Sequence, residues 1–350
     1  MDKITINGST SYNVLIERNI LDNVGNILAG ELGGNKALVV TDTHVAALYL
    51  GEVSDSLEEA GYDVTSLKLS PGEETKNIDN YVFVLNTLSE NDFSTSDLII
   101  ALGGGTIGDL VGFVASTYKR GMKCIQIPTT LLACVDSSIG GKSAVNLTTG
   151  KNQVGTIKNP SIVFCDPNVV SSLSKNALLE GYAEIIKYGI LDGLEIVKLL
   201  REAIESKDYS EVVAKAISIK KSYVEEDECD SNSRQFLNLG HFVGHAIEAA
   251  SGYSISHGKA VALGLVIESK CCALSGLCEM SSYLEISSII REFGFDDTNH
   301  YGLQELLPYI LRDKRIRDGK IDIIVPARIG NCILRKIPAS DLEDFLRLGL

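Results

Sequence analysis

The sequence has no excess of basic residues, and this shortage is the first limit on its function. It carries 32 Lys and Arg against 46 Asp and Glu, which gives a formal net charge of −14 at pH 7. A general nucleic-acid-binding protein needs a basic face that displaces the counterions of the phosphate backbone. Nucleic acid is therefore not an expected partner.

Long apolar runs and paired cysteines are also missing. Residues 1–8 contain no apolar segment typical of a secretory signal, and no run approaches the ~20 residues of a membrane-spanning helix. The eight cysteines form no Cys-x-x-Cys pair and lie mostly in apolar stretches, which favours reduced, buried thiols over disulfides. Tryptophan, internal repeats and low-complexity tails are absent. We expect a cytoplasmic protein with no membrane partner.

The order of apolar patterns predicts two domains within the 350 residues. Near-continuous apolar segments alternate with helical patterns such as 54–60 and 78–91, and the expected strands are 36–42, 63–69, 97–102, 123–128 and 161–167. This alternation predicts a Rossmann-like α/β domain with a mostly parallel sheet over residues 1–168. A mostly α-helical domain follows over residues 169–350, with expected helices at 175–199, 209–226, 237–251, 259–274 and 282–293 and a late hairpin turning at 330–331.

Three of the five histidines, His241, His245 and His257, lie within 17 residues of each other. His241 and His245 are four apart, so on a helix both rings share one face. Neutral imidazole is a common zinc ligand, and a carboxylate from elsewhere can complete such a site. Two partly buried helix histidines beside a loop histidine explain the pattern equally well. Phe242 stands where a zincin needs glutamate, which disfavours a metalloprotease.

A glycine-rich turn joins a predicted strand to an apolar helix at Gly103, Gly104 and Gly105. Glycines let the backbone approach a phosphate, and a helix N-terminus supplies free N–H groups, so the turn favours nucleotide pyrophosphate binding. The strict G-x-G-x-x-G pattern is matched only loosely, and such turns also occur without ligands. Upstream, Asp42 and the loop 71–76 can reach a ribose and adenine, unless they are merely solvated.

A second polar stretch, 128–142, is dense in hydroxyls and is followed by Gly150-Lys151-Asn152. It lacks the spacing of a P-loop. Lys142, Lys151 and Asn152 together indicate an anion site in an otherwise acidic chain, although a solvated loop has the same composition.

Several long motifs occur in one order, at residues 103–109, 128–142, 183–189 and 234–245. Taken together they resemble the 3-dehydroquinate synthases of the sugar phosphate cyclase family, over about residues 42–315. The resemblance implies a zinc (or cobalt) site made of Glu184, His241 and His257, with His245 lining the substrate pocket. It also implies a homodimer that converts 3-deoxy-D-arabino-heptulosonate 7-phosphate to 3-dehydroquinate and phosphate in the shikimate pathway.

The same resemblance assigns the remaining site residues. NAD would be held by Asp42, Glu73, Lys76, Gly103, Gly104, Gly105, Asp109, Thr129, Thr130, Asp136, Lys142 and Lys151. The substrate phosphate would contact Lys142, Asn152, Asn238, His245 and, from a partner subunit, Arg120. The substrate carboxylate would contact Lys220, Arg234 and Lys314, while Asp109, Asp136 and Lys187 would complete the polar catalytic pocket.

The chain departs from the family pattern at three places near these motifs. Cys229 stands where arginine is frequent, Lys259 replaces the glutamate that usually follows His257-Gly258, and Glu180 precedes the 183–189 motif where small or apolar residues are usual. The alternatives are an NAD- and metal-dependent polyol dehydrogenase, another sugar phosphate cyclase and a non-catalytic NAD sensor. Clustered basic residues for phosphate and carboxylate favour the 3-dehydroquinate synthase reaction.

Overall fold

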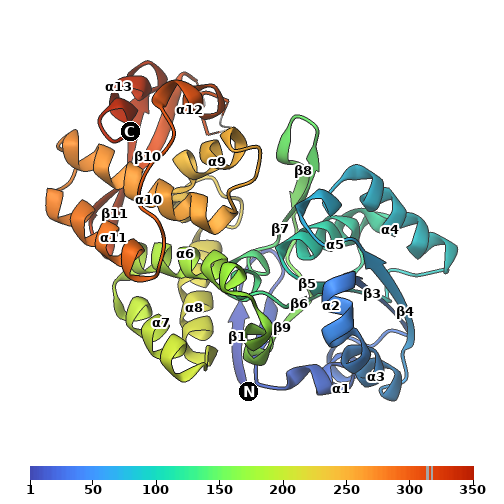
Figure 1. Cartoon of the computed structure of the whole chain (residues 1–350). Coiled ribbons are helices and arrows are strands. Elements are labelled where there is room, and N and C mark those ends of the chain that lie inside the picture. The colour runs from blue at the N-terminus through green and yellow to red at the C-terminus, as the bar shows by residue number, and fades with distance from the viewer. Residues whose placement is uncertain (313–314, 317) are drawn as a thin grey trace. The chain divides into compact units, whose positions relative to one another are not determined.

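A computed structural model of the chain describes residues 1–312, 315–316 and 318–350 (Figure 1). The chain divides into two compact units. The first comprises Met1–Leu173 with Ser206–Cys229, and the second comprises Ser174–Glu205 with Asp230–Leu350. The boundary expected near residue 168 stays a prediction about domains, because compactness alone does not define a part that folds independently. Within the described residues, no helix combines the length and apolar character needed to cross a bilayer.

The first unit is built on a seven-stranded sheet with the order β1-β2-β9-β6-β5-β3-β4. Only β1 runs antiparallel to its neighbour, and the other adjacent pairs are parallel. The strands are β1 (Asp2–Ile6), β2 (Tyr12–Ile16), β3 (Lys36–Asp42), β4 (Asp63–Leu69), β5 (Leu98–Gly103), β6 (Lys123–Pro128) and β9 (Ile162–Cys165). The β3 and β5 strands are buried over nearly their whole length, which explains their continuous apolar sequence.

The strand order reverses between β3 and β5, because β4 lies on one side of β3 and β5 on the other. In open parallel sheets, ligands bind at the carboxyl ends of the strands at such a point. The register pairs Thr41 with Leu102 and Gly103 with Pro128. The residues that follow β3, β5 and β6 therefore meet at one edge of the sheet, which we call the nucleotide edge.

Six helices belong to the first unit: α1 (Val24–Glu31), α2 (Thr43–Val45), α3 (Gly51–Glu59), α4 (Ile78–Glu90), α5 (Gly105–Thr117) and α8 (Ser210–Glu226). Helices α4 and α5 share one apolar core with β3 and β5, in which Val84, Leu88 and Val111 are fully buried. Helix α8 packs against β1 although about 200 residues separate them. Burial of these apolar faces fixes α5, and with it the glycine turn, against the sheet.

A two-stranded hairpin, β7 (Lys142–Leu147) and β8 (Gly150–Ile157), forms where the sequence predicted only a polar loop. Their residues are mostly polar or small, so they lack the continuous apolar runs on which the central strands of the sheet were predicted. Figure 1 shows the hairpin extending beyond the other strands of the first unit.

The second unit is mostly helical and also contains one hairpin, β10 (Lys320–Arg328) and β11 (Asn331–Pro338). Its helices are α6 (Lys175–Asp192), α7 (Glu195–Ser206), α9 (His241–Ala250), α10 (His257–Leu274), α11 (Met280–Glu292), α12 (Leu303–Ile310) and α13 (Leu342–Arg347). Helix α10 packs against α6, α9 and α11. It is therefore the central helix of this unit, and thirteen of its 18 residues are buried.

Three expected helix boundaries were wrong. The single helix predicted for 175–199 is broken at Gly193, whose φ of 120° is a left-handed value that favours glycine. The helix predicted from residue 237 starts only at His241, because Gly240 has a φ of 78° and Ser233–Asn238 form a 3-10 turn. His257 was expected in a loop but is the first residue of α10.

Candidate functional site

The glycine turn at the nucleotide edge leaves no room for side chains. A Cβ at Gly103 would lie 2.8 Å from the Ile107 Cβ, and one at Gly105 would lie 2.9 Å from the Ser137 Oγ. Helix α5 begins at Gly105 with no side-chain hydrogen bond to its first N–H groups among the described residues. These N–H groups, with the positive end of the helix dipole, can accept an anion such as a pyrophosphate.

The loop after β4 reaches the same edge through a chain of polar contacts. Glu73 accepts hydrogen bonds from the Thr106 hydroxyl at 3.1 Å and from the Asn146 amide at 2.8 Å. The buried Lys76 ammonium lies 2.5 Å from Asp109 and 3.8 Å from Glu73. Burial by itself would lower the pKa of Lys76, but Asp109 and Glu73 raise it, so this lysine stays charged. Three residues that the resemblance assigns to NAD or its pocket, Glu73, Lys76 and Asp109, are thus in one network.

Other residues expected at NAD are also in the first unit. Thr129 follows β6, and its N–H donates to the Gly103 carbonyl at 3.0 Å. Asp42 ends β3, but one of its carboxylate oxygens already accepts the N–H groups of His44 and Val45. Lys220, which the resemblance assigns to the substrate carboxylate, donates to Asp136 at 2.7 Å.

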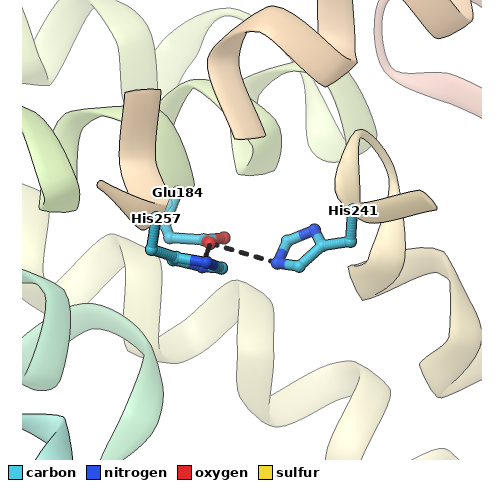
Figure 2. A group of neighbouring side chains, drawn as sticks. All are labelled: Glu184, His241 and His257. Carbon is cyan, nitrogen blue, oxygen red and sulfur yellow. Dashed lines mark hydrogen bonds and ion pairs between the residues drawn. The ribbon is translucent and has the colours of Figure 1, made fainter. Parts of the chain in front are cut away.

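Three side chains from three helices of the second unit converge on one point (Figure 2). Glu184 comes from α6, His241 from α9 and His257 from α10. The Nε2 atoms of His241 and His257 lie 3.3 and 3.1 Å from the same Glu184 oxygen. One ligand atom from each residue lies within 4.8 Å of the others, a spacing that fits a single metal ion.

Each ring is oriented by its other nitrogen. The His241 Nδ1 lies 3.1 Å from the Leu239 carbonyl, and the His257 Nδ1 lies 3.2 Å from a Glu248 oxygen. A proton held at Nδ1 by these acceptors leaves the Nε2 lone pair directed at the metal position. The donor set of one carboxylate and two neutral imidazoles is typical of catalytic zinc sites, which keep a position open for substrate or water.

Glu248 was missed by the sequence prediction. It is 2% exposed and belongs to α9, seven residues after His241 and three after His245. This spacing places all three residues on one helix face, which was the signal available in the sequence. A second donor set, made of His245, Glu248 and His257, also lies within 4.8 Å. Since His245 is exposed and Glu248 already orients His257, the buried set with Glu184 fits a metal better.

The buried Glu184 carboxylate is surrounded by groups that can carry a positive charge. Burial alone would raise its pKa, but Lys187 and the two histidines hold the pKa well below its usual range. The Lys187 ammonium contacts the second Glu184 oxygen. Burial lowers the pKa of His241, whereas Glu184 and Glu248 overcome burial and raise the pKa of His257 to about 10. The ionised carboxylate is the charge state that a divalent cation requires, whereas His257 is protonated in the metal-free chain and has to release its Nε2 proton when a cation binds.

Two family models match successive parts of the chain. The 3-dehydroquinate synthase N-terminal model matches residues 66–180, and the C-terminal model matches residues 181–316. A 3-dehydroquinate synthase of Streptococcus suis (strain 05ZYH33) is 38% identical over 356 residues, covering 99% of this chain and 100% of the relative. The chain belongs to the 3-dehydroquinate synthase family. The expected family membership is therefore confirmed.

Solved structures of other cyclases share the fold. A 2-deoxy-scyllo-inosose synthase complexed with carbaglucose-6-phosphate, NAD+ and Co2+ has a TM-score of 0.88 at 22% identity, over 100% of both chains. ValA (2-epi-5-epi-valiolone synthase) from Streptomyces hygroscopicus subsp. jinggangensis 5008, with NAD+ and Zn2+ bound, has a TM-score of 0.87 at 23% identity over 98% of both chains. The expected fold class, an α/β part followed by a mostly helical part, is confirmed.

Not every site residue expected for this family lies in the two clusters described above. Arg234 is 1% exposed on the 3-10 turn before α9, and Asn238 ends the same turn. Lys142 begins β7, and Arg120 follows α5 in a left-handed conformation with a φ of 68°. Thr130 accepts the Ala133 N–H through its hydroxyl. Lys151 and Asn152 are on β8. Lys314 lies outside the residues that the structure describes.

The three departures from the family pattern have different surroundings. Cys229 is an exposed free thiol at the end of the first unit. Lys259 is on the first turn of α10 and donates to Asn176 at 3.3 Å. Glu180 accepts the Gly258 N–H at 2.6 Å, so it joins α6 to the start of α10. Two of the three therefore lie beside the helix that carries His257.

Proposed function

We propose that this chain catalyses the 3-dehydroquinate synthase reaction, which converts 3-deoxy-D-arabino-heptulosonate 7-phosphate to 3-dehydroquinate and inorganic phosphate. Membership of the family supports the reaction. The observation that carries the proposal is the convergence of Glu184, His241 and His257 within 4.8 Å. The reaction proceeds by transient oxidation, phosphate elimination, reduction and intramolecular aldol closure, and it involves no net oxidation.

The metal would be zinc or cobalt, held by these three residues. The fit rests on the chemistry of the donors: a buried ionised carboxylate, two Nε2 atoms directed at it, and both Nδ1 atoms engaged elsewhere. NAD would be held at the nucleotide edge, where the side-chain-free turn of Gly103 to Gly105 exposes helix N–H groups. When bound, NAD takes and returns a hydride, and the metal acts as a Lewis acid at the substrate oxygens.

The chain's own polar residues would bind the two anionic groups of the substrate. We assign the phosphate to Lys142, Asn152, Asn238 and His245, and the carboxylate to Lys220, Arg234 and Lys314. Ammonium and guanidinium groups form charge-assisted hydrogen bonds to such oxygens. Lys220 would have to share its Asp136 contact with the substrate, because it donates to that carboxylate in the structure.

Phosphate release gives the most direct test. Purified protein incubated with the heptulosonate phosphate, NAD and zinc is expected to release inorganic phosphate and form 3-dehydroquinate without accumulating NADH. A polyol dehydrogenase would accumulate NADH from glycerol or a related polyol and release no phosphate. Turnover of glucose 6-phosphate, which has no carboxylate, would instead indicate another cyclase. If the protein released no phosphate and accumulated no NADH with any of these substrates, catalysis would be refuted.

The metal assignment has its own variant. His257→Ala is expected to lose zinc and turnover while still binding NAD, because His257 and the glycine turn belong to different units. Zinc content is measured by metal analysis and NAD binding by calorimetry. Full activity and zinc content in His257→Ala would refute the ligand assignment.

We further propose a cytoplasmic homodimer in which Arg120 contacts the substrate phosphate bound to its partner. Arg120 follows Lys119, and both have left-handed φ values, 47° and 68°, which give the loop an unusual fixed path. If Arg120 acts in its partner's site, mixing inactive Arg120→Ala and His257→Ala proteins would restore activity in heterodimers. A monomer in sedimentation, or no complementation after subunit exchange, would contradict the proposal.

A further inference from the structure

Helix α10 begins without the groups that normally stabilise a helix N-terminus. Ser256 precedes the helix, but its hydroxyl makes no hydrogen bond with any described residue, and no acidic residue lies in the first turn. The third position is Lys259, a positive charge beside the positive end of the helix dipole. A serine followed three residues later by glutamate would form a capping box, and lysine cannot do so. The ligand His257 is the first residue of this poorly capped turn.

A carboxylate from another helix occupies this position instead. Glu180 of α6 accepts the Gly258 N–H at 2.6 Å, although 78 residues separate them. A Cβ at Gly258 would lie 2.5 Å from the Glu180 Cα, so the two backbones touch and the carboxylate meets the helix end directly. Lys259 turns toward the same helix and donates to Asn176.

Glu180 and the ligand Glu184 are four residues apart on α6, so both lie on the same face of the helix. Their carboxylates, one turn apart on α6, therefore act on neighbouring residues of α10: Glu184 contacts the His257 ring, and Glu180 accepts the N–H of Gly258. From this arrangement we infer that Glu180 is a positioning residue, which caps α10 from outside and thereby fixes His257 against Glu184. The inference rests on the metal site proposed above.

Substitution of Glu180 tests this role in two measurements. Glu180→Ala is expected to weaken zinc binding about tenfold, the loss typical when a group that orients a metal ligand is removed. Zinc affinity is measured by competition with a chelator. In metal-free protein, hydrogen exchange of the peptide around Ser256 to Ala260 is expected to become faster, because the Gly258 N–H loses its acceptor.

Rescue distinguishes capping from a general structural role. Lys259→Glu in the Glu180→Ala background places a carboxylate three residues after Ser256, so it rebuilds a capping box within the helix. This double variant is expected to recover both the zinc affinity and the slow exchange. Glu180→Gln keeps an oxygen that can accept the N–H and should lose less affinity, and it replaces Glu180→Ala if that variant does not fold.

Glu305→Ala is the matched control. Glu305 accepts the Gly302 N–H at 2.7 Å at the start of α12, a helix that carries no proposed ligand. Its substitution is expected to leave zinc affinity unchanged. The inference is overturned if Glu180→Ala keeps native zinc affinity and exchange, if Lys259→Glu restores neither, or if Glu305→Ala weakens zinc equally. Zinc retained by Glu184→Ala would refute the metal site itself, whereas the exchange measurement in metal-free protein still tests the cap.

Discussion

Glu268 offers a test of how a buried carboxylate supports the helix that carries His241. Its side chain, on α10, is 6% exposed and accepts hydrogen bonds from the N–H groups of Gly240 at 3.0 Å and Val243 at 2.9 Å. Burial raises the pKa of Glu268 from 4.5 to about 7, although these bonds and Arg315 lower it. The desolvation of the charge thus outweighs the attraction of the helix end.

This pKa shift has a defined sign for stability. Between pH 4.5 and pH 7 the folded chain keeps a proton that the unfolded chain has released, so the free energy of unfolding falls as the pH rises through this window. Below pH 4.5 both states are protonated and nothing is lost. Each pKa unit corresponds to about 1.36 kcal/mol, which gives a total loss of about 3 kcal/mol, of which roughly 2.5 kcal/mol falls between pH 5 and pH 8.

Glu268→Gln isolates this contribution, because glutamine has nearly the same shape but does not titrate. Its single oxygen can accept only one of the two N–H groups, and the loss of the other bond adds an offset that does not vary with pH. Urea unfolding of metal-free wild-type and variant protein is measured from pH 5 to pH 8. The difference in unfolding free energy is expected to move in favour of the variant by about 2.5 kcal/mol over this range, whatever its constant offset. A constant difference would refute the raised pKa. A change of opposite sign would mean that the backbone N–H groups and Arg315 keep the carboxylate ionised.

Other perturbations address the metal and the buried ion pair. Glu248→Ala removes the acceptor of the His257 Nδ1–H. It is expected to raise the Kd for zinc about 10- to 100-fold, measured by competition with a chelator. An unchanged Kd would mean that Glu248 does not orient the ring. Asp109→Ala leaves the buried Lys76 with only Glu73 as an ion-pair partner. It is expected to lower the free energy of unfolding, measured in urea, by about 3 kcal/mol. A decrease below about 1 kcal/mol would mean that Glu73 alone is sufficient to stabilise the Lys76 charge. Chelation is expected to stop phosphate release and zinc or cobalt to restore it, so release by metal-free protein would contradict a metal role.

The central strands of the sheet could be predicted from the sequence because they are buried on both faces, whereas β1 and β2 were not predicted. Strands β3 and β6 begin and end where their apolar runs do. The β7–β8 hairpin could not be predicted in this way, since polar and small residues interrupt its few apolar side chains. The break at Gly193 was missed because the apolar pattern continues on both sides of it, and only a backbone conformation interrupts the helix.

The metal site was predictable only in part. Spacing placed His241 and His245 on one face, but it could not choose between His245 and His257, and the choice of Glu184 came from family resemblance. Helix packing brings these residues together, and no local pattern encodes it. For the same reason Glu180 could be noticed as an unusual residue but not as the partner of a helix end 78 positions away.

The division of the chain also bears on its synthesis. The polypeptide leaves the first unit after Leu173, re-enters it at Ser206 and leaves again after Cys229. A growing chain released as far as Leu173 therefore lacks α8 and the lysine that binds Asp136, and two helices of the other unit emerge from the ribosome before α8 arrives. A single gene junction cannot exchange one whole unit between relatives, because each unit is made of two separate stretches of the chain.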